Sequence, residues 1–330
     1  MANAPLLGRQ ESVGVGLESV SGTQAATLAW QPHLALTLDR KTNTVENQSG
    51  MGRLEQTNDS AIVEQWAEGS LNGKIYWDTF GYFLSNIFGA TPTASVHASE
   101  TTVYDNAFAI AQTSVPPCLS LVRANSIATR GFTMGMLSDL EIDIKQQDWI
   151  QFTATVQTKT GATTTATAAY STTEGDFTSK HATLSFAPYG STSYAAAQTK
   201  SIKLKISRKL ERFTPLGQTD PACFDIDSYT VTGTIVQRWT DTVLENIAAA
   251  NTAQAMQLVI KNTDATIGTA TNPSLTITCP KVRLDPATTD NKLDQTLSQT
   301  FNFEAQLDAT GAGNLITAVL TNKKNGYTKS

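Results

Sequence analysis

Three carboxylates at alternate positions come closest to a chemical site in this chain. They are Asp139, Glu141 and Asp143, in the stretch S-D-L-E-I-D-I-K. In an extended strand alternate residues share a face, so the three acids lie on one side and the intervening leucine and isoleucines on the other. Paired acids can serve glycoside hydrolysis or calcium binding. Acidic residues are mostly exposed in proteins, and a solvated strand face is therefore the commoner outcome.

No other motif indicates catalysis. The remaining candidates by residue type are His33, His97, His181, Cys118, Cys223 and Cys279. The histidines form no H-x-x-x-H or H-E-x-x-H pattern, and we expect surface or structural roles. The cysteines lack C-x-x-C spacing, which favours buried free thiols over disulfides or zinc. The glycine-rich segment 14–22 lacks the lysine of a phosphate loop, and no G-x-S-x-G elbow occurs. We expect no enzyme activity, cofactor or metal.

The composition excludes several classes of protein. The 330 residues carry a net charge of -5, with 24 Lys and Arg against 29 Asp and Glu, which gives no basic field for tight binding of nucleic acid. Charged residues make up 16%, below the ~25% of typical soluble domains. The N-terminus has no signal-peptide pattern, and no window of ~20 apolar residues could span a membrane. We expect a protein assembled in the cytoplasm without membrane insertion of its own.

The strands are indicated by alternating apolar residues. In residues 150–156 the apolar side chains fall on one face, and similar alternation occurs in 34–38, 202–206, 275–277 and 301–307. Low charge and abundant threonine suit sheets whose faces meet something other than bulk water. The pattern predicts a mainly β protein.

A short aromatic helix interrupts this pattern at about residues 78–88. Its apolar positions, which we expect to be buried, are Trp77, Phe80, Leu84, Ile87 and Phe88. Asp78 could act in the first turn, and Gly89 stands where helices end in a left-handed residue. A helix this short is unstable alone in water, so its aromatic side must pack on a sheet.

A second helix of the same kind is predicted after Gly233. It carries Val243, Leu244 and Ile247, which we also expect to be buried, and Thr242 and Glu245 have capping-box spacing. The matched segments are, in chain order, 34–41 with 202–209, 69 with 233, 84 with 244, 117–121 with 273–277, and 150–156 with 301–307. Their offsets fall smoothly along the chain, which indicates a duplicated unit.

The duplication divides the chain into four parts. We expect an N-terminal arm at 1–27, a first repeat at 28–157, a Thr/Ala/Ser/Gly-rich linker or extended loop at 158–200, and a second repeat with a C-terminal tail at 201–330. The arm and a long loop at about 39–60 look too polar and glycine-broken to form core. We therefore expect a protein without residues 2–20 to fold.

Four stretches of the sequence are similar to those of a known protein family. They are V-G-V-G-L-E-S-V-S-G-T, G-S-L-N-G-K-I-Y-W-D-T-F-G-Y-F-L-S-N-I-F-G, P-P-C-L-S-L-V and V-T-G-T-I-V-Q-R-W-T-D-T-V. Together these stretches resemble the tail tube proteins, or major tail proteins, of long-tailed bacteriophages. The resemblance covers most of the chain and is a pattern of order and spacing.

The resemblance implies a fold, a function and partners. Each repeat would be a β-sandwich or barrel with one short flanking helix, and subunits would close into rings that stack into a tube for genome delivery. Two repeats per chain imply a trimeric ring with pseudo-sixfold symmetry, with a hexameric ring as the alternative. Implied partners are a tape measure protein and tail terminator or tip proteins, and DNA would pass without tight binding.

Two questions stay open at the level of sequence. Asp139, Glu141 and Asp143 are candidates for an acidic lumen face, but alternation does not decide whether their face points inward or outward. A cell-surface or secreted β-sandwich that binds carbohydrate, an adhesin, shares the Thr-rich strands and is the alternative function.

Overall fold

The computed structural model describes residues 7–32, 34–48, 52–54, 56–98, 100–112, 116–291, 293, 296–309 and 313–330. Nineteen strands, two α-helices and two 3-10 turns, Gly8–Gln10 and Ser179–His181, occur in these ranges. The prediction of a mainly β fold is confirmed. Among the described residues, neither helix is long and apolar enough to cross a membrane.

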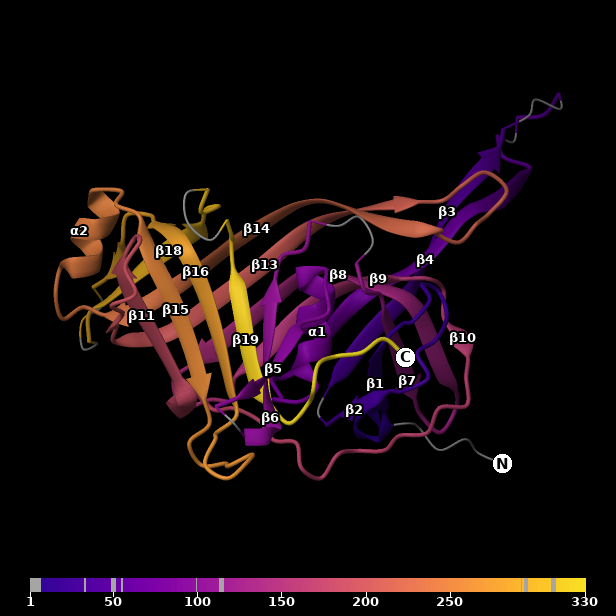
Figure 1. The fold of residues 1–330 in the computed structure, drawn as a ribbon. Coiled ribbons are helices and arrows are strands. Elements are labelled where there is room, and N and C mark those ends of the chain that lie inside the picture. The colour runs from indigo at the N-terminus through magenta and orange to yellow at the C-terminus, as the bar shows by residue number, and fades with distance from the viewer. Residues whose placement is uncertain are drawn as a thin grey trace.

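One antiparallel sheet of eight strands, here called the long sheet, runs through the whole molecule (Figure 1). In spatial order its strands are β3 (Ala35–Asn47), β4 (Asp59–Lys74), β9 (Gln151–Thr158), β8 (Thr129–Lys145), β13 (Thr199–Phe213), β14 (Cys223–Arg238), β18 (Ser298–Ala305) and β17 (Thr288–Asp290). Within the described ranges β3 pairs only with β4, and β17 only with β18. Strand β3 is therefore one edge of the long sheet. Strand β17 is the other, and next to it the end of β16 (Ser274–Leu284) also pairs with β18.

Two side sheets cover one face of the long sheet. The first contains β2 (Ala29–Gln31), β1 (Ser12–Leu17), β7 (Leu119–Ala124), the start of β8, and β10 (Ala162–Thr163). The second contains β5 (Thr93–His97), β6 (Glu100–Ala109), β19 (Thr317–Asn322), β16 (Ser274–Leu284), β15 (Gln254–Lys261), β11 (Ala182–Pro188) and β12 (Ala195–Ala196).

Strand β8 belongs to the long sheet and to the first side sheet because it bends in the middle. Met134 has a positive φ of 54°, and Gly135 follows it. A Cβ on Gly135 would lie 2.7 Å from the carbonyl oxygen of Leu119, so only glycine fits there. Residues before the bend pair with β7 and residues after it pair with β9 and β13.

Helix α1 (Phe80–Phe88) fills the core between the layers, and every one of its residues is buried. Trp77, which precedes it, is also buried. Gly89 ends the helix in the left-handed conformation with φ 77°, as expected. The aromatic ring of Tyr327, from the C-terminal tail, covers the helix at Gly81, where a Cβ would lie 2.0 Å from the ring.

Helix α2 (Val243–Ala249) lies at the far end of the molecule and is less covered (Figure 1). Leu244 is buried and Ile247 is half-buried, but Val243 is 59% exposed, so its predicted burial is wrong. The predicted capping box is also absent: the Val243 amide donates to Asp241 Oδ1 at 3.0 Å, and Thr242 makes no side-chain cap. Val243 points to a side of α2 that none of the described residues covers.

The expectation of a flexible N-terminal arm at residues 1–27 is wrong for residues 12–17, which form strand β1. Val13, Val15 and Leu17 are at most 1% exposed and belong to the core. The glycines between them allow close packing, because a Cβ on Gly14 would lie 3.1 Å from the Trp30 ring. Removing residues 2–20 would take away a core strand, so we no longer expect that truncation to fold.

Three further expectations change in the structure. Residues 39–47 and 59–60 of the expected loop belong to the two strands of a projecting β3–β4 hairpin. The expected linker contains the core strand β11, with Leu184 1% exposed. The matched segments 117–121 and 273–277 occupy different positions, since β7 pairs with β1 and β8 whereas β16 pairs with β15, β18 and β19. Alternating strands resemble one another whatever their place in a sheet.

Candidate assembly and lumen surface

The three acids of β8 project from the polar face of the long sheet, beside the lysines of β13. The Lys205 ammonium lies 3.1 Å from Asp139, and the Lys203 ammonium lies 2.9 Å from Glu141. Asp143 is 2.7 Å from the ammonium of Lys145 on its own strand and 4.0 Å from that of Lys203. The acids are therefore neutralised by neighbours, and the acidic character expected from sequence is local to one strand.

These ion pairs mark the joint where β8 meets β13. The hydrogen bond that the Lys203 ammonium donates to Glu141 raises the pKa of Lys203, which keeps it charged. Partly exposed pairs of this kind add little stability, but opposite charges on facing strands favour one register over its neighbours. Ser207 adds a hydroxyl hydrogen bond of 2.6 Å to Asp139. The pairs therefore specify how the two halves of the long sheet meet.

The rest of this face mixes small neutral polar groups with carboxylates such as Glu304. Thr232 and Thr234 of β14 and Asn302 of β18 line an open hollow of about 380 Å³ together with Glu141 and Lys203. Thr234 donates to Asn302 Oδ1 at 3.1 Å. The surface presents hydroxyls, amides and charges of both signs, which offer no strong site for a polyanion.

Arg208 joins the two halves on the opposite, buried face. It is 3% exposed and its guanidinium donates to Asn86 O at 2.6 Å, to Asn86 Oδ1 at 2.7 Å and to Leu137 O. All three acceptors belong to the first half of the chain, whereas Arg208 lies on β13. Burial lowers the pKa of Arg208, and the nearby Tyr229 hydroxyl opposes this shift.

Sequence reasoning missed Arg208, although a signal for it exists. Ile202, Leu204 and Ile206 alternate on the inward face of β13, and position 208 continues that face. A charged residue at an inward position is paired with polar groups in stable proteins, so it predicts a buried hydrogen-bond network.

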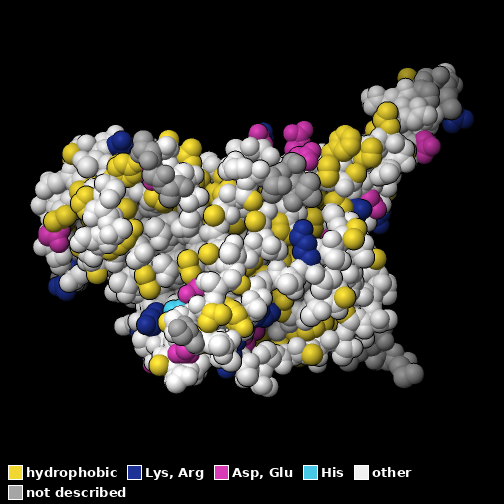
Figure 2. Space-filling view, viewed as in Figure 1, with side chains coloured by type: hydrophobic (Ala, Val, Ile, Leu, Met, Phe, Trp, Pro, Cys, Tyr) yellow, Lys and Arg dark blue, Asp and Glu magenta, His cyan; other side chains and the backbone are white. Residues whose placement is uncertain are grey.

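Two hairpins project together from one end of the long sheet. The amide of Gln65, on the β3–β4 hairpin, donates to Thr219 O at 2.8 Å in the loop between β13 and β14. Arg212 lies 3.4 Å from Glu64 and stacks 3.7 Å from the Trp66 ring. Exposed apolar side chains of this pair of hairpins are Val45, Ile62, Val63 and Phe213. Figure 2 shows hydrophobic groups gathered where the hairpins leave the body.

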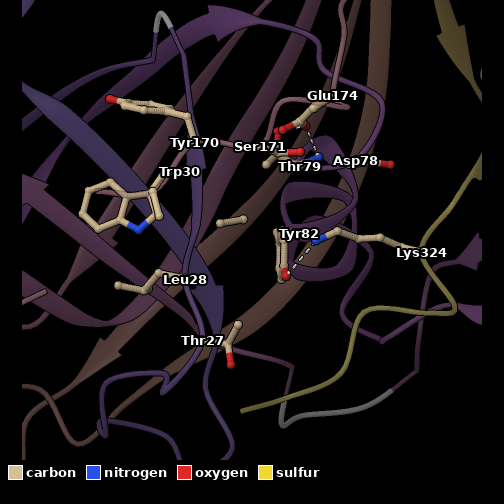
Figure 3. A pocket seen from close by; sticks show the side chains of 12 residues that line it. Thr27, Leu28, Trp30, Asp78, Thr79, Tyr82, Tyr170, Ser171, Glu174 and Lys324 are labelled. Atoms are coloured by element: carbon tan, nitrogen blue, oxygen red, sulfur yellow. Dashed lines mark hydrogen bonds between the residues drawn. The ribbon is translucent and has the colours of Figure 1, made fainter. Parts of the chain in front are cut away.

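A pocket of about 260 Å³ lies between β2 and α1, walled by residues 169–171, Glu174 and Lys324 (Figure 3). Glu174 Oε1 accepts hydrogen bonds of 2.6 Å from both the amide and the hydroxyl of Thr79, at the start of α1. Burial raises the pKa of Glu174 and that of Asp78. Lys324 donates to the Tyr82 hydroxyl at 3.1 Å. These contacts hold two separate chain segments on the helix.

The histidines and cysteines stand apart from this surface. His97 lies 2.8 Å from Asp105, His181 lies 3.2 Å from Asp264, and His33 falls outside the described residues. The cysteines are free, with Cys279 buried and Cys118 and Cys223 half-buried. Burial raises the pKa of Cys279 to about 12.

Comparison with known proteins gives one finding that fits this architecture. A search of curated proteins finds no match. A comparison with protein families matches residues 8–305 to the phage tail tube protein family, which covers the long sheet and most of both side sheets. The chain belongs to the phage tail tube protein family and is a structural protein of the virion tail.

Proposed function

We propose that this chain assembles into trimeric rings with pseudo-sixfold symmetry, and that the rings stack into a tube through which the genome passes. Family membership supports a tube role, and the long sheet supports the symmetry. The observation that carries the proposal is the order of that sheet, β3-β4-β9-β8 followed by β13-β14-β18-β17. The two halves have the same connectivity, each beginning with a long hairpin.

Local details repeat between the two halves. Gly69 stands opposite Leu38 on β3, and Gly233 stands opposite Leu204 on β13. A Cβ on either glycine would clash with a strand carbonyl, at 1.6 Å for Gly69 and 2.1 Å for Gly233. Matching constraints at matching places favour a duplicated unit.

The joint between β8 and β13 supplies a template for contacts between copies. In the first half the hairpin that joins β8 to β9 pairs Asp143 with Gln151, and in the second half the β17–β18 hairpin pairs Asp290 with Ser298. The edge strand β17 is thus equivalent to β8, and the edge strand β3 is equivalent to β13. Pairing β17 of one copy with β3 of the next repeats the joint and closes a continuous sheet around a ring.

The equivalence also sets the register of the contact. It places Leu38 at the position of Leu204, two residues away from the sequence match of 34–41 with 202–209. Glu141 stands opposite Lys205 in the internal joint. Thr288 is equivalent to Glu141, because each lies two residues before the paired aspartate, Asp290 or Asp143. Asp39 is equivalent to Lys205, because each directly follows the leucine that faces the glycine. Thr288 of one copy should therefore lie opposite Asp39 of the next.

In this ring the polar face of the long sheet lines the lumen, because the other face is covered by the side sheets. Asp139, Glu141 and Asp143 would then face the DNA, each beside a lysine. Paired charges and threonines offer a polyanion neither strong repulsion nor a binding site, so the DNA can slide.

A cross-link between copies tests the ring. In a Cys118→Ala, Cys223→Ala background, Asp39→Cys with Thr288→Cys should give disulfide-closed trimers, seen as one covalent species by denaturing mass measurement. The control pair Lys41→Cys with Thr288→Cys is displaced by one strand repeat on the same face and should cross-link poorly. Covalent hexamers would indicate the alternative symmetry, and a protein that stays monomeric at high concentration would refute ring assembly.

A further inference from the structure

We infer that the N-terminal segment of one copy, residues 4–7, binds the groove beside α2 of a neighbouring copy. This inference rests on the ring proposed above. It concerns a surface of the second half of the chain that its own residues leave open.

The groove has an apolar lining and exposed apolar rims. It encloses about 460 Å³ between β11, β12 and α2, and Phe186, Val243, Leu244 and Ile247 contribute to its walls. Val243 is 59% exposed. Large side chains left in water on a helix next to a hollow indicate a contact surface.

Two more exposed apolar residues lie next to the groove. Trp239 is 37% exposed and Leu297 is 43% exposed. The Trp239 amide donates to the Leu297 carbonyl at 3.1 Å, which holds the two residues together where β14 ends and β18 approaches. Gln237 and Thr240, which flank Trp239, line the groove itself.

The same place in the first half of the chain is covered. There the Ile75 amide donates to the Ile150 carbonyl at 3.0 Å, beyond the ends of β4 and β9, and both residues are 0% exposed. The Ile150 amide in turn donates to Phe177 O at 3.0 Å, and Phe177 is itself 0% exposed. Nearby, Tyr170 forms a parallel bridge with Trp30 on the outer edge of β2.

The covering segment is the stretch of chain that leads into β11. Strand β11 is the counterpart of β1: each is followed by a short strand that pairs back on it, and each also pairs with a strand that follows its half's helix, β7 or β15. Phe177 lies 11 residues before Pro188, the last residue of β11 (188 − 177), and Leu6 lies 11 residues before Leu17, the last residue of β1 (17 − 6). Residues 4–7 read A-P-L-L.

The segment that reaches this groove must come from another copy. Strand β1, which this segment precedes, and α2 lie toward opposite ends of the molecule (Figure 1). Leu7, the first described residue, is 64% exposed and therefore available to a neighbour. In the proposed ring, the first half of the next copy lies beside the second half of this copy, just as the second half lies beside the first half within one chain. The N-terminal segment of the next copy therefore corresponds to the segment that leads into β11. The leading residues of the next copy then fall on Trp239, Val243 and Leu297.

Charge substitutions on both sides test the contact. Leu6→Asp alters the segment and Val243→Asp alters the groove, and the double variant combines them. Ile127→Asp is the matched control, because Ile127 is 78% exposed in the turn between β7 and β8. The unfolding midpoint of the Val243→Asp monomer should be unchanged, since the Val243 side chain is 59% exposed. Ring formation is followed by sedimentation and electron microscopy over a concentration series.

Each single substitution should raise the concentration needed for ring formation by about tenfold or more, because an apolar contact is lost and a charge is buried. The double variant should cost little more than either single one, and Ile127→Asp should assemble like the wild type. A photo-cross-linker at Leu7 should join peptides that contain residues 239–247 of a second copy.

Wild-type assembly by Val243→Asp, or cross-links elsewhere, would overturn this contact while leaving the tube intact. If the wild-type protein forms no rings at any concentration, the proposed function fails and the contact fails with it. Additive effects of the two substitutions would mean that segment and groove do not touch each other, which also refutes the inference.

Discussion

Replacing Arg208 with alanine should destabilise the whole chain, because this side chain joins its two halves. Arg208 is 3% exposed and donates to Asn86 O, Asn86 Oδ1 and Leu137 O. Hydrogen bonds from a charged donor contribute about 1.5 to 3 kcal/mol each in favourable cases. The simple sum is an upper limit, since removing the guanidinium also removes the cost of burying its charge.

The acceptors left behind lower the estimate further. Asn86 O still accepts the Gly89 amide at 3.1 Å, and Asn86 Oδ1 still accepts the Leu137 amide at 2.8 Å. We therefore expect a loss of about 2 to 4 kcal/mol, mainly from the cavity and from weakened hydrogen bonding. Arg208→Lys should restore little, since an ammonium cannot reproduce the planar fork that reaches both Asn86 and Leu137.

Urea unfolding followed by tryptophan fluorescence and circular dichroism measures this effect. Arg123→Ala is the control, because Arg123 makes a partly exposed ion pair with Glu11 that is worth at most about 1 kcal/mol. A change below about 0.5 kcal/mol for Arg208→Ala, similar to an ordinary surface substitution, would refute the role of Arg208 as a joint. Full recovery by Arg208→Lys would show that charge alone matters.

Two further predictions concern α1 and Glu174, which accepts hydrogen bonds at the start of this helix. Phe80→Ala should cost ~3 to 5 kcal/mol in the same unfolding assay, because the ring is 0% exposed and packs 5.4 Å from the Phe152 ring; an unchanged midpoint would contradict its core role. Burial raises the pKa of Glu174, so the folded state favours the neutral acid: this contribution is complete below the unfolded pKa and is lost as pH rises through the folded one. Glu174→Gln keeps the acceptor for Thr79 and should gain stability relative to the wild type between pH 4 and pH 7, and a constant difference over that range would exclude the mechanism.

Elements fixed by local interactions could be predicted from the sequence. The α1 helix was expected at about 78–88 and spans Phe80–Phe88, with Gly89 as its left-handed end. The helical spacing of aromatic residues and the terminal glycine are signals that depend only on residues a few positions apart. The helix can therefore be predicted without knowing the rest of the fold. The alternating strands and the mainly β class follow from equally local patterns.

The place of each strand could not be predicted in this way. The glycines of the 12–17 segment suggested a flexible arm, yet the segment is a core strand because Trp30 packs onto Gly14. In the same way, the sequence of β8 predicts an acidic face, but in the structure Lys203 and Lys205 of β13 lie beside these acids. Both outcomes depend on partners far away in the chain.

The sequence by itself determined the strand and helix content, the buried face of α1, and the low and nearly balanced charge of the chain. Only the tertiary structure decided which strands form the edges of the long sheet, that Arg208 joins the two halves, and that α2 leaves Val243 exposed. The physical reason is that alternation assigns a residue to a face of its strand, whereas burial and pairing depend on what the rest of the chain brings to that face.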